Sequence, residues 1–538
     1  MSRVQSGSFA PFSVGSNDAA SWLAPSGAEM ARLDQRTISA GISSLELMER
    51  AGAAVAASVQ AVLGSSHGRV LVLCGPGNNG GDGLVVARLL ASRGVAVTAT
   101  VVSSPKYSPD CIEQMRKFDS AMVVGRAPDA LASQGLLREC SRDDFSGWLA
   151  SAAVVVDAIL GTGQRQALPV EVAEQVSALA AEKRRRPALR VVAVDIPTGV
   201  SADTGALAEA HVSADLTVAI EFIKRGCMQF PGRAACGEIV TAPIGIAPGA
   251  DVQFSLLEGA ARPRLLRRRV DGHKGDVGRV LVVGGSADMP GAPLLAALGA
   301  LHSGAGLVSR VWRQSWSGVG FLPECMNVTV QGDGEFLDGR DAQALASAVR
   351  GADVVVIGPG LGRTAGVREF VGAMLELVRA EGRRAVVDAD ALFHVAANSQ
   401  QLSGVQAVIT PHPGEAAALL RCSVEQVQAD RFSAACELSQ RFGCVAVLKG
   451  AGTLVVGSGR HGIIARGSQY MATAGSGDVL SGVVAACLAR SESMFDAAAV
   501  AAYVHACAGE RAAAESGGPV LASEIARWCA SVMGALDQ

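Results

Sequence analysis

Residues 69–83 read RVLVLCGPGNNGGDG, and they decide the fold of the first half of the chain. A run of valine and leucine residues leads directly into a turn that contains five glycines and two side-chain amides. Such an apolar run predicts a strand that is buried on both faces of a parallel sheet. The glycines allow backbone N–H groups to approach a phosphate group where the next helix begins.

The same alternation of short strands and helical patterns recurs through the first half of the chain. It predicts βαβ units and therefore a parallel sheet, so the fold class is α/β. Further strands are expected within residues 95–105, 152–163, 190–199 and 214–222, and one long helix over residues 29–63, with Leu45, Met48 and the alanines of 51–57 on its apolar side.

The second half resumes the alternation after a break. Residues 246–270 contain Pro, Gly and an arginine cluster at 267–269, which we expect to face solvent, but no long strand. We therefore predict two different α/β domains, 25–246 and 270–535, joined by a linker over 247–269. Strands of the second domain are expected within residues 278–286, 352–362, 384–392, 405–415 and 444–453, and an apolar helix within 474–489.

The composition excludes several classes of protein. The chain has 538 residues, a net charge of -3 and 4% aromatic residues, which favours neither nucleic-acid binding nor base stacking. No stretch of about 18 apolar residues predicts a membrane span. Residues 1–16 lack the basic start and apolar run of a signal peptide. The twelve cysteines form no C-x-x-C pair, so we expect buried thiols in a cytoplasmic protein.

Carboxylates at the strand ends of the first half indicate a site. Asp157 and Asp195 each follow an apolar strand, where a carboxylate either binds a ligand or ion or caps the next helix. Together with Asn79 and Thr198 they offer oxygen ligands on neighbouring strand ends, which suits a hard cation. Lys224 follows the last strand, where it either faces solvent or places a positive charge near the site.

Two glycine-rich segments of the first half could hold phosphate. GPGNNGGDG matches G-x-G-x-x-G, but the next strand ends in TVVSSPK, without the carboxylate of a standard dinucleotide site. GTGQRQALP at 161–169 is a second glycine-rich loop. We therefore expect a phosphorylated ligand that is not bound as in an NAD dehydrogenase.

The second half lacks the P-loop pattern G-x-x-x-x-G-K-[ST] but contains another device for phosphate. In ATAGSGDVLSG, Gly475 and Gly477 lie where a helix begins, so that backbone N–H groups can stabilise phosphoryl charge. Asp478 in the first turn either accepts a proton from a substrate hydroxyl or only complements the helix dipole. Lys449 in KGAGT can meet a nucleotide phosphate. His412, between two prolines that stiffen the strand end, either is placed for a ligand, which we favour, or has a structural role.

Two other motifs of the second half lie at strand ends. GPGLG at 358–362 forms a flexible loop that could hold an anion. Asp388 and Asp390 in DAD either position Mg²⁺ through water or have a structural capping role. The sequence leaves both alternatives open.

In the first half, GPGNNGGDG, VDAILGTG, VDIPTGV and IKRG, in this order, resemble the NAD(P)H-hydrate epimerase family over residues 25–246. The resemblance implies a Rossmann-like three-layer sandwich that interconverts the R and S epimers of hydrated NADH and NADPH, called NADHX and NADPHX. It implies K⁺ binding by Asn79, Asp157 and Thr198, and proton transfer by Asp195 with Lys224. The implied contacts to the hydrated cofactor are Asn78, Asn79, Gly80, Gly81, Asp82, Gly161, Thr162, Gly163, Gln164, Arg165, Gln166, Ala167 and Asp195. Leu160 and Thr198 stand where the family often has Phe and Ser.

In the second half, HKGDVGRVLVVGGS, GPGLG, VVDADAL, TPHPGE, LKGAGT and AGSGDVLSG resemble the NAD(P)H-hydrate dehydratase branch of the ribokinase-like superfamily. The resemblance implies that a nucleotide, ADP rather than ATP, phosphorylates the hydrate hydroxyl with Asp478 as the base, and that phosphate then leaves. Mg²⁺ would accompany the nucleotide. The implied contacts are Ala292, Gly362, His412 and Asp478 for the hydrated cofactor, and Lys449, Gly450, Ala451, Gly452, Thr453 and Gly477 for the nucleotide. SADMPGAP at 286–293 lacks the aromatic residue that relatives usually have before the Gly-Ala pair.

The two resemblances support each other. Hydration of a nicotinamide ring can give either epimer, and a stereospecific dehydratase recovers only one of them. We therefore expect a homo-oligomeric repair enzyme acting on NADHX and NADPHX, without nucleic-acid or membrane partners. Two alternatives are a vitamin-precursor kinase with a regulatory N-terminal half, and an N-terminal half that binds without catalysing.

Overall fold

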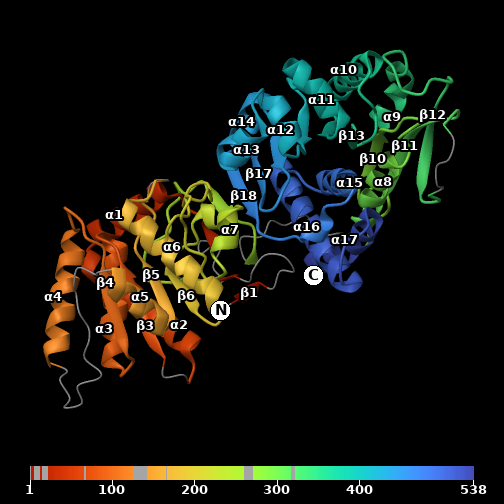
Figure 1. The fold of residues 1–538 in the computed structure, drawn as a ribbon. Coiled ribbons are helices and arrows are strands. Elements are labelled where there is room, and N and C mark those ends of the chain that lie inside the picture. The colour runs from red at the N-terminus through yellow and green to blue at the C-terminus, as the bar shows by residue number, and fades with distance from the viewer. Residues whose placement is uncertain are drawn as a thin grey trace. The chain divides into compact units, whose positions relative to one another are not determined.

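The computed structural model describes residues 2–4, 12–14, 22–65, 68–124, 142–164, 167–259, 271–316 and 322–537. Apart from the first nine residues, the chain divides into two compact units, Ala10–Ser255 and Leu256–Gln538 (Figure 1). The division lies inside the range that the sequence assigns to a linker. The arginine cluster at 267–269 and the predicted contacts Arg165 and Gln166 lie outside the described residues.

The N-terminal unit contains one sheet in the order β1-β2-β8-β7-β6-β5-β3-β4, and only β1 pairs antiparallel. Its strands are β1 (Ser2–Val4), β2 (Phe12–Val14), β3 (Arg69–Cys74), β4 (Val97–Val101), β5 (Ala152–Ala158), β6 (Arg190–Val194), β7 (Leu216–Ile220) and β8 (Glu238–Ala242). Its helices are α1 (Gly27–Ser39), α2 (Ser44–Leu63), α3 (Asn78–Ser92), α4 (Pro109–Val124), α5 (Arg142–Ser151), α6 (Val170–Arg185), the 3₁₀ helix η2 (Arg225–Met228) and α7 (Gly232–Ala235).

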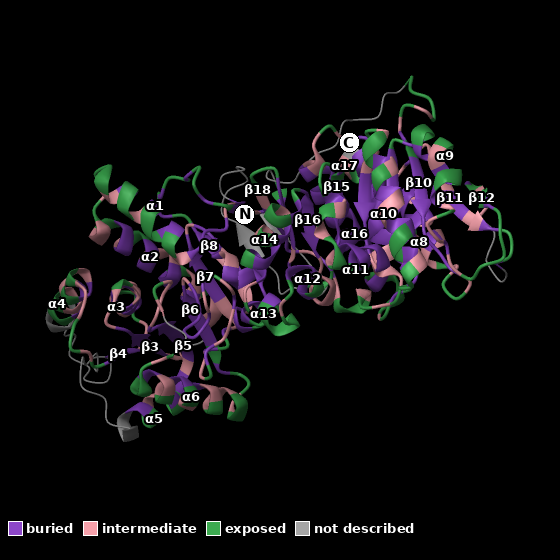
Figure 2. Ribbon diagram, turned by 90° about the horizontal axis from the view of Figure 1, so that it is seen from above, coloured by how far each residue is buried: buried purple, intermediate pink, exposed green. Residues whose placement is uncertain are grey.

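Helices cover both faces of this sheet. Successive side chains of a strand point to opposite faces, and in β3 Val70 and Val72 pack with apolar residues of α1, α2, α3 and α4. Leu71 and Leu73 pack instead with residues of α5 and α6. Figure 2 shows the strands as buried and parts of the helices as exposed. The predicted three-layer α/β arrangement with a parallel sheet is therefore confirmed.

The long helix predicted over residues 29–63 is wrong, because the structure has two helices there. The chain turns at Gly41, whose φ of 107° lies in the region that favours glycine. Ser43 then caps α2 by accepting a hydrogen bond from the backbone N–H of Glu46 at 3.2 Å. As a result Met48 is buried as predicted, whereas Leu45 is only partly buried.

The glycine-rich turn after β3 is shorter than the sequence suggests, because α3 begins at Asn78. Asn78–Asp82 therefore form the first turns of a helix. A Cβ atom on Gly75 would lie 1.7 Å from the carbonyl oxygen of Ile159, and one on Gly80 would lie 1.8 Å from that of Gly75. These two glycines are needed for close backbone packing between the start of α3 and the end of β5.

The C-terminal unit contains a sheet in the order β12-β11-β10-β13-β14-β15-β16-β17-β18-β9. The strands from β12 to β16 are parallel, and β17 and β18 add an antiparallel hairpin. The strands are β9 (Phe254–Leu256), β10 (Arg279–Val283), β11 (Leu307–Arg313), β12 (Cys325–Val330), β13 (Val354–Ile357), β14 (Arg384–Val387), β15 (Gln406–Ile409), β16 (Val445–Leu448), β17 (Thr453–Gly457) and β18 (Arg460–Ile464). The sequence did not predict β9, β11, β12 or the hairpin.

This sheet is also covered on both faces. Its helices are α8 (Ala292–His302), the 3₁₀ helix η4 (Ala342–Leu345), α9 (Ala346–Gly351), α10 (Ala365–Ala380), α11 (Asp390–Ala397), η5 (Ser399–Leu402), α12 (Pro413–Leu420), α13 (Val424–Ala429), α14 (Arg431–Phe442), η6 (Gln469–Met471), α15 (Ser476–Ala489), α16 (Met494–Ser516) and α17 (Ala522–Asp537). Val280 and Val282 pack with residues of α8, α15, α16 and α17. Leu281 and Val283 point to the opposite face and are equally buried.

No helix among the described residues is long and apolar enough to cross a membrane. The eleven cysteines in the described part of the chain are all free thiols, and all but Cys422 and Cys436 are buried. Cys140 lies outside the described residues. The expectation of buried thiols is thus confirmed for most of the described cysteines.

We predict that Gly482→Ala destabilises the C-terminal unit. The added Cβ would lie 1.8 Å from the carbonyl oxygen of Ala296, so α8 and α15 would have to separate. Overpacking of this kind costs about 1–3 kcal/mol. Gly534→Ala in α17, where a Cβ meets nothing within 4 Å, is the matched control and should not destabilise. Urea unfolding of both variants measures the difference; equal midpoints would contradict the predicted contact.

Candidate functional site

A cleft of about 440 Å³ lies at the carboxyl ends of β3, β5, β6 and β7 in the N-terminal unit. Parallel strands end at the same edge of a sheet, which is where ligands of such folds bind. The predicted residues that line the cleft are Asn78, Asn79, Asp82, Gly161, Thr162, Gly163, Gln164, Asp195 and Lys224. Gly80 and Gly81 lie in α3 between lining residues and are buried.

Asp157 and Thr198 are in direct contact beside this cleft. The Thr198 hydroxyl donates to one carboxylate oxygen of Asp157 at 2.7 Å, and the Thr198 backbone N–H donates to the other at 2.7 Å. The same hydroxyl accepts a hydrogen bond from the backbone N–H of Leu160 at 3.1 Å. Both side chains are fully buried. Burial raises the pKa of Asp157 to about 6, although these hydrogen bonds oppose the rise.

The surroundings of Asp157 fit a cation with oxygen ligands. Among the described residues no lysine or arginine makes an ion pair with this buried carboxylate. Asn79 lies against Gly161, where an added Cβ would be 3.4 Å from the Asn79 Cβ. Among the described residues, the side-chain nitrogen of Asn79 is buried without a hydrogen-bond partner; this N–H₂ group is a donor, so only the side-chain oxygen of Asn79 could bind a cation. No group of three His, Cys, Asp or Glu side chains gathers as a metal site in the described ranges.

Asp195 and Lys224 form an ion pair in the cleft. Lys224 is fully buried, and its ammonium group also donates to the carbonyl oxygen of Ile220 at 2.9 Å. The bonded carboxylate oxygen of Asp195 accepts from the backbone N–H of Ile220 at 3.0 Å. Asp195 has a φ of 67°, a strained backbone conformation for a residue other than glycine. Lys224 therefore does not face solvent, which was one of the two alternatives from the sequence.

Asp34 was missed by the sequence analysis, and it lines the same cleft from α1. Burial raises its pKa to about 6; the charge of Lys224 opposes this shift and that of Asp195 adds to it. Burial and the carboxylates of Asp195 and Asp34 also raise the pKa of Asp82. The cleft thus places three carboxyl groups near one buried ammonium group.

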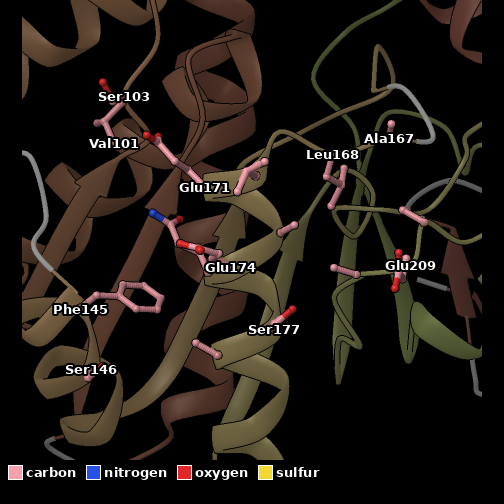
Figure 3. Close-up of a pocket in the computed structure, with 16 residues that line it drawn as sticks. Val101, Ser103, Phe145, Ser146, Ala167, Leu168, Glu171, Glu174, Ser177 and Glu209 are labelled. Atoms are coloured by element: carbon pink, nitrogen blue, oxygen red, sulfur yellow. The ribbon is translucent and has the colours of Figure 1, made fainter.

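A second, open groove of about 1460 Å³ runs along α6. Figure 3 shows Glu171, Glu174 and Ser177 on this helix and Phe145 nearby. The predicted contact Ala167 lines this groove and not the cleft. The groove contains no other predicted site residue, and its carboxylates are unsuited to a phosphate group.

In the C-terminal unit Lys449, Asp388, Glu415 and Asp478 gather at the carboxyl ends of β14, β15 and β16. The Lys449 ammonium group lies 2.9 Å from an Asp388 oxygen and 3.7 Å from a Glu415 oxygen. Burial opposes the charge of Lys449, but these carboxylates raise its pKa. Burial and the charge of Asp388 raise the pKa of Asp478 to about 7, against the effect of Lys449. Asp478 is thus poised to exchange a proton near neutral pH.

The first turn of α15 is arranged as predicted. Gly475 caps the helix with a φ of 86°, and Asp478 lies in the first turn. A Cβ on Gly477 would be 3.3 Å from the Lys449 nitrogen, so the ammonium group and the helix start face each other. His505 of α16, which the sequence did not single out, contacts the carbonyl oxygen of Ser476 at 2.9 Å. Burial lowers the pKa of His505 to about 4, so it is neutral at pH 7.

Other predicted residues of this unit have structural contacts. His412 caps α12, because its Nδ1 accepts from the backbone N–H of Gly414 at 3.0 Å, while its side chain stays largely exposed. Asp390 accepts from the backbone N–H of Gly362 at 2.9 Å and from Arg363 at 2.9 Å. These contacts give Asp390 the structural role that the sequence left open, in fixing the GPGLG loop.

The remaining predicted contacts lie at the start of α8 and in the segment between β16 and β17. Ala292 begins α8 and lies against Gly360, where an added Cβ would be 3.0 Å away. The KGAGT segment, 449–453, connects β16 to β17. Arg431, also missed from the sequence, is buried behind it and donates to the carbonyl oxygens of Leu448 and Lys449, each at 3.2 Å. This guanidinium group fixes the loop, and burial lowers its pKa to about 10.

Comparisons with known proteins match both units. A family model described as NAD(P)H-hydrate dehydratase matches residues 280–530, and one described as YjeF-related protein N-terminus matches residues 44–226. The bifunctional NAD(P)H-hydrate repair enzyme Nnr of Pyrobaculum aerophilum is 36% identical over 92% of this chain and 95% of its own length. The protein of the same name from Escherichia coli is 38% identical, over 89% and 87%.

The chain belongs to the family of bifunctional NAD(P)H-hydrate repair enzymes. A solved structure of the ADP/ATP-dependent NAD(P)H-hydrate dehydratase from Bacillus subtilis, co-crystallised with ATP and Mg²⁺, is 28% identical. It covers 51% of this chain and 95% of its own, with a TM-score of 0.43. The two-domain relatives match nearly the whole chain, so this family member has both parts of the repair enzyme.

We predict that Lys449→Met strongly destabilises this repair-family protein. Asp388 has an exposed fraction of 1%, so the substitution would leave a buried carboxylate without its cation. Breaking one side of a buried pair costs about 3–5 kcal/mol. The double variant Lys449→Met/Asp388→Asn should recover much of the lost stability because both charges are then removed. Urea unfolding measures this coupling, and additive effects of the two substitutions would refute it.

Proposed function

We propose that this chain repairs hydrated nicotinamide cofactors with two activities. The N-terminal unit epimerises the R and S forms of NADHX and NADPHX, and the C-terminal unit dehydrates the S form to NADH or NADPH. The dehydratase consumes ADP and gives AMP and phosphate. The observation that carries the proposal is the position of Asp478, beside Lys449 and in the first turn of α15, in a chain that matches two-domain repair enzymes.

Transfer of a phosphoryl group to a hydroxyl requires a base and groups that stabilise negative charge on the phosphoryl group. The C-terminal unit has both. Asp478 removes the proton from the hydrate hydroxyl, whose oxygen then attacks the terminal phosphorus of the nucleotide. Lys449 and the backbone N–H groups at the start of α15 stabilise the charge on the phosphoryl group. When phosphate leaves, the C–O bond breaks, the neighbouring ring carbon loses a proton, and the dihydronicotinamide is restored.

In the N-terminal unit, Asp195 and Lys224 are proposed to move the proton that epimerisation requires. The start of α3 supplies backbone N–H groups for a cofactor phosphate, and the segment Gly161–Gln164 lines the opposite part of the cleft. The C-terminal unit accepts only one epimer, so an epimerase on the same chain allows both to be recovered.

Of the two implied metal ions, the residues present fit K⁺. Asp157, Thr198 and the side-chain oxygen of Asn79 would hold K⁺, which would offset the buried charge of Asp157 and stiffen the strand ends beside the cleft. The Asp390 carboxylate accepts hydrogen bonds from the backbone N–H of Gly362 and from Arg363, and the Asp388 carboxylate accepts one from Lys449. Neither carboxylate is therefore free to bind Mg²⁺. We therefore infer that Mg²⁺ enters with the nucleotide phosphates. It would neutralise phosphate charge there.

Three further expectations belong to this proposal. ADP is the favoured phosphoryl donor, with ATP as the alternative. The protein acts on these small molecules as a homo-oligomer, without a nucleic-acid or membrane partner. Its proposed location is the cytoplasm.

Purified protein given mixed hydrate epimers and ADP is expected to convert both to NADH or NADPH, measured by the recovery of ultraviolet absorbance.

Asp478→Asn should lower the dehydration rate by at least about 100-fold, because a general base contributes about 10²–10⁴. In the wild type, the dehydration rate should rise with pH through about 7, because the Asp478 carboxyl loses its proton there. A stable phosphorylated product without restored absorbance would identify a kinase and overturn the assignment.

We predict that K⁺ raises the melting temperature of the N-terminal unit in the wild type and in Thr198→Ser, but much less in Thr198→Val. Serine keeps the hydroxyl oxygen, whereas valine has a similar shape and removes it. Epimerisation should show the same dependence on K⁺ relative to Li⁺. Calorimetry of the three proteins in each salt tests the site, and equal stabilisation of all three would exclude Thr198 as a ligand.

A further inference from the structure

Helix α1 presents one stripe of side chains to the cleft. Met30, Asp34 and Ile38 are spaced by four residues and all line it, since such residues share one face of a helix. The start of α1 is firmly held: Ser26 and Glu29 form a reciprocal capping box, and the Gly27 N–H donates to Asp203 at 2.8 Å. The carboxyl group of Asp34 therefore enters the cleft from a fixed support.

Asp34 differs from the other acidic side chain of the proposed mechanism. The Asp195 carboxylate is held by Lys224 and by the Ile220 backbone N–H. Within the described residues, the Asp34 carboxyl makes no hydrogen bond and no ion pair, although it lies between the apolar Met30 and Ile38. A partly buried carboxyl without a protein partner is available to a ligand.

Burial in the cleft, more than the charges around it, raises the pKa of Asp34. The charged groups that line the cleft in the described part of the chain are Asp34 itself, Asp82 from α3, Asp195 after β6 and Lys224 after β7. Burial raises the pKa of Asp34 to about 6. Asp34 can thus give or accept a proton near neutral pH. Asp195, by contrast, is paired with Lys224.

We propose that Asp34 is a second catalytic acid–base residue of the epimerase, which exchanges a proton with the ring hydroxyl while Asp195 serves the other face of the ring. The inference rests on the proposed epimerase function. Inversion at one carbon requires a group to leave from one face and to return on the other, so two proton-transfer groups on different walls of the cleft suit it.

The reaction balances without an added reactant. Protonated Asp34 gives its proton to the hydroxyl, the C–O bond breaks, and water leaves as the ring-nitrogen lone pair forms a C=N bond. Water then adds to the same carbon from the opposite face and gives a proton to Asp195. The nitrogen regains its lone pair, and proton exchange with solvent restores Asp34 and Asp195. Both carboxylates also stabilise the cationic intermediate.

The full-length protein and its variants test this. Asp34→Asn should lower the kcat of epimerisation by at least about 100-fold with little change in KM, and Asp34→Glu should recover part of the rate. Asp119→Asn removes the same charge from an exposed position of α4 and should change nothing. Dehydration of the pure S epimer should be unaffected in every variant. Epimer exchange is followed by NMR.

The pH profile separates chemistry from a structural effect. The wild-type epimerisation rate should fall as pH rises through about 6, where Asp34 loses its proton, and Asp34→Asn should lack this decrease. An Asp34→Asn rate within threefold of the wild type would overturn the role of Asp34 and leave the epimerase assignment intact. A wild type that does not interconvert the epimers would overturn the proposed function, and the inference with it.

Discussion

Each unit depends on one lysine whose ammonium group lies among carboxylates. Lys449 lies between Asp388 and Glu415, and Lys224 pairs with Asp195. Several negative charges could not share a low-dielectric pocket without a positive one, because the cost of removing them from water is large. The lysines thus allow carboxyl groups to gather at the strand ends. At Asp478, burial and the charge of Asp388 raise the pKa, and Lys449 opposes this rise.

The sequence predicts most of the sheet that brings these groups together. Apolar runs such as RVLVLC are buried on both faces, and their ends meet at one edge, so the contact between Asp157 and Thr198 follows from topology. The strands that were missed carry weaker patterns. β11 contains two arginines, and four of the six residues of β12 are at least partly exposed. A search for apolar runs misses strands that contain charged or exposed residues.

The residues that were missed lack a local signal. Asp34 stands in ARLDQR, which has the composition of a solvated helix face, and only the packing of α1 over the strand ends buries it. His505 and Arg431 contact backbone carbonyl oxygens at the start of α15 and at the end of β16, 29 and 17 residues away in the sequence. The turn at Gly41 was missed because apolar spacing continues on both sides of it. Tertiary packing decides the first three cases, and periodicity along the chain does not record it. Gly41 and the capping residue Ser43, by contrast, are local signals of the turn.

Helix α1 forms one wall of the cleft in the N-terminal unit. Similarity to the N-terminal family model begins at residue 44, beyond the end of α1. A fragment cut at that limit would keep strands β3 to β8 and the glycine-rich turn, but it would lose β1, β2 and the cleft residues Met30, Asp34 and Ile38. One wall of the cleft would then be open to water. The boundary of the matching family model is therefore not the boundary of the cleft.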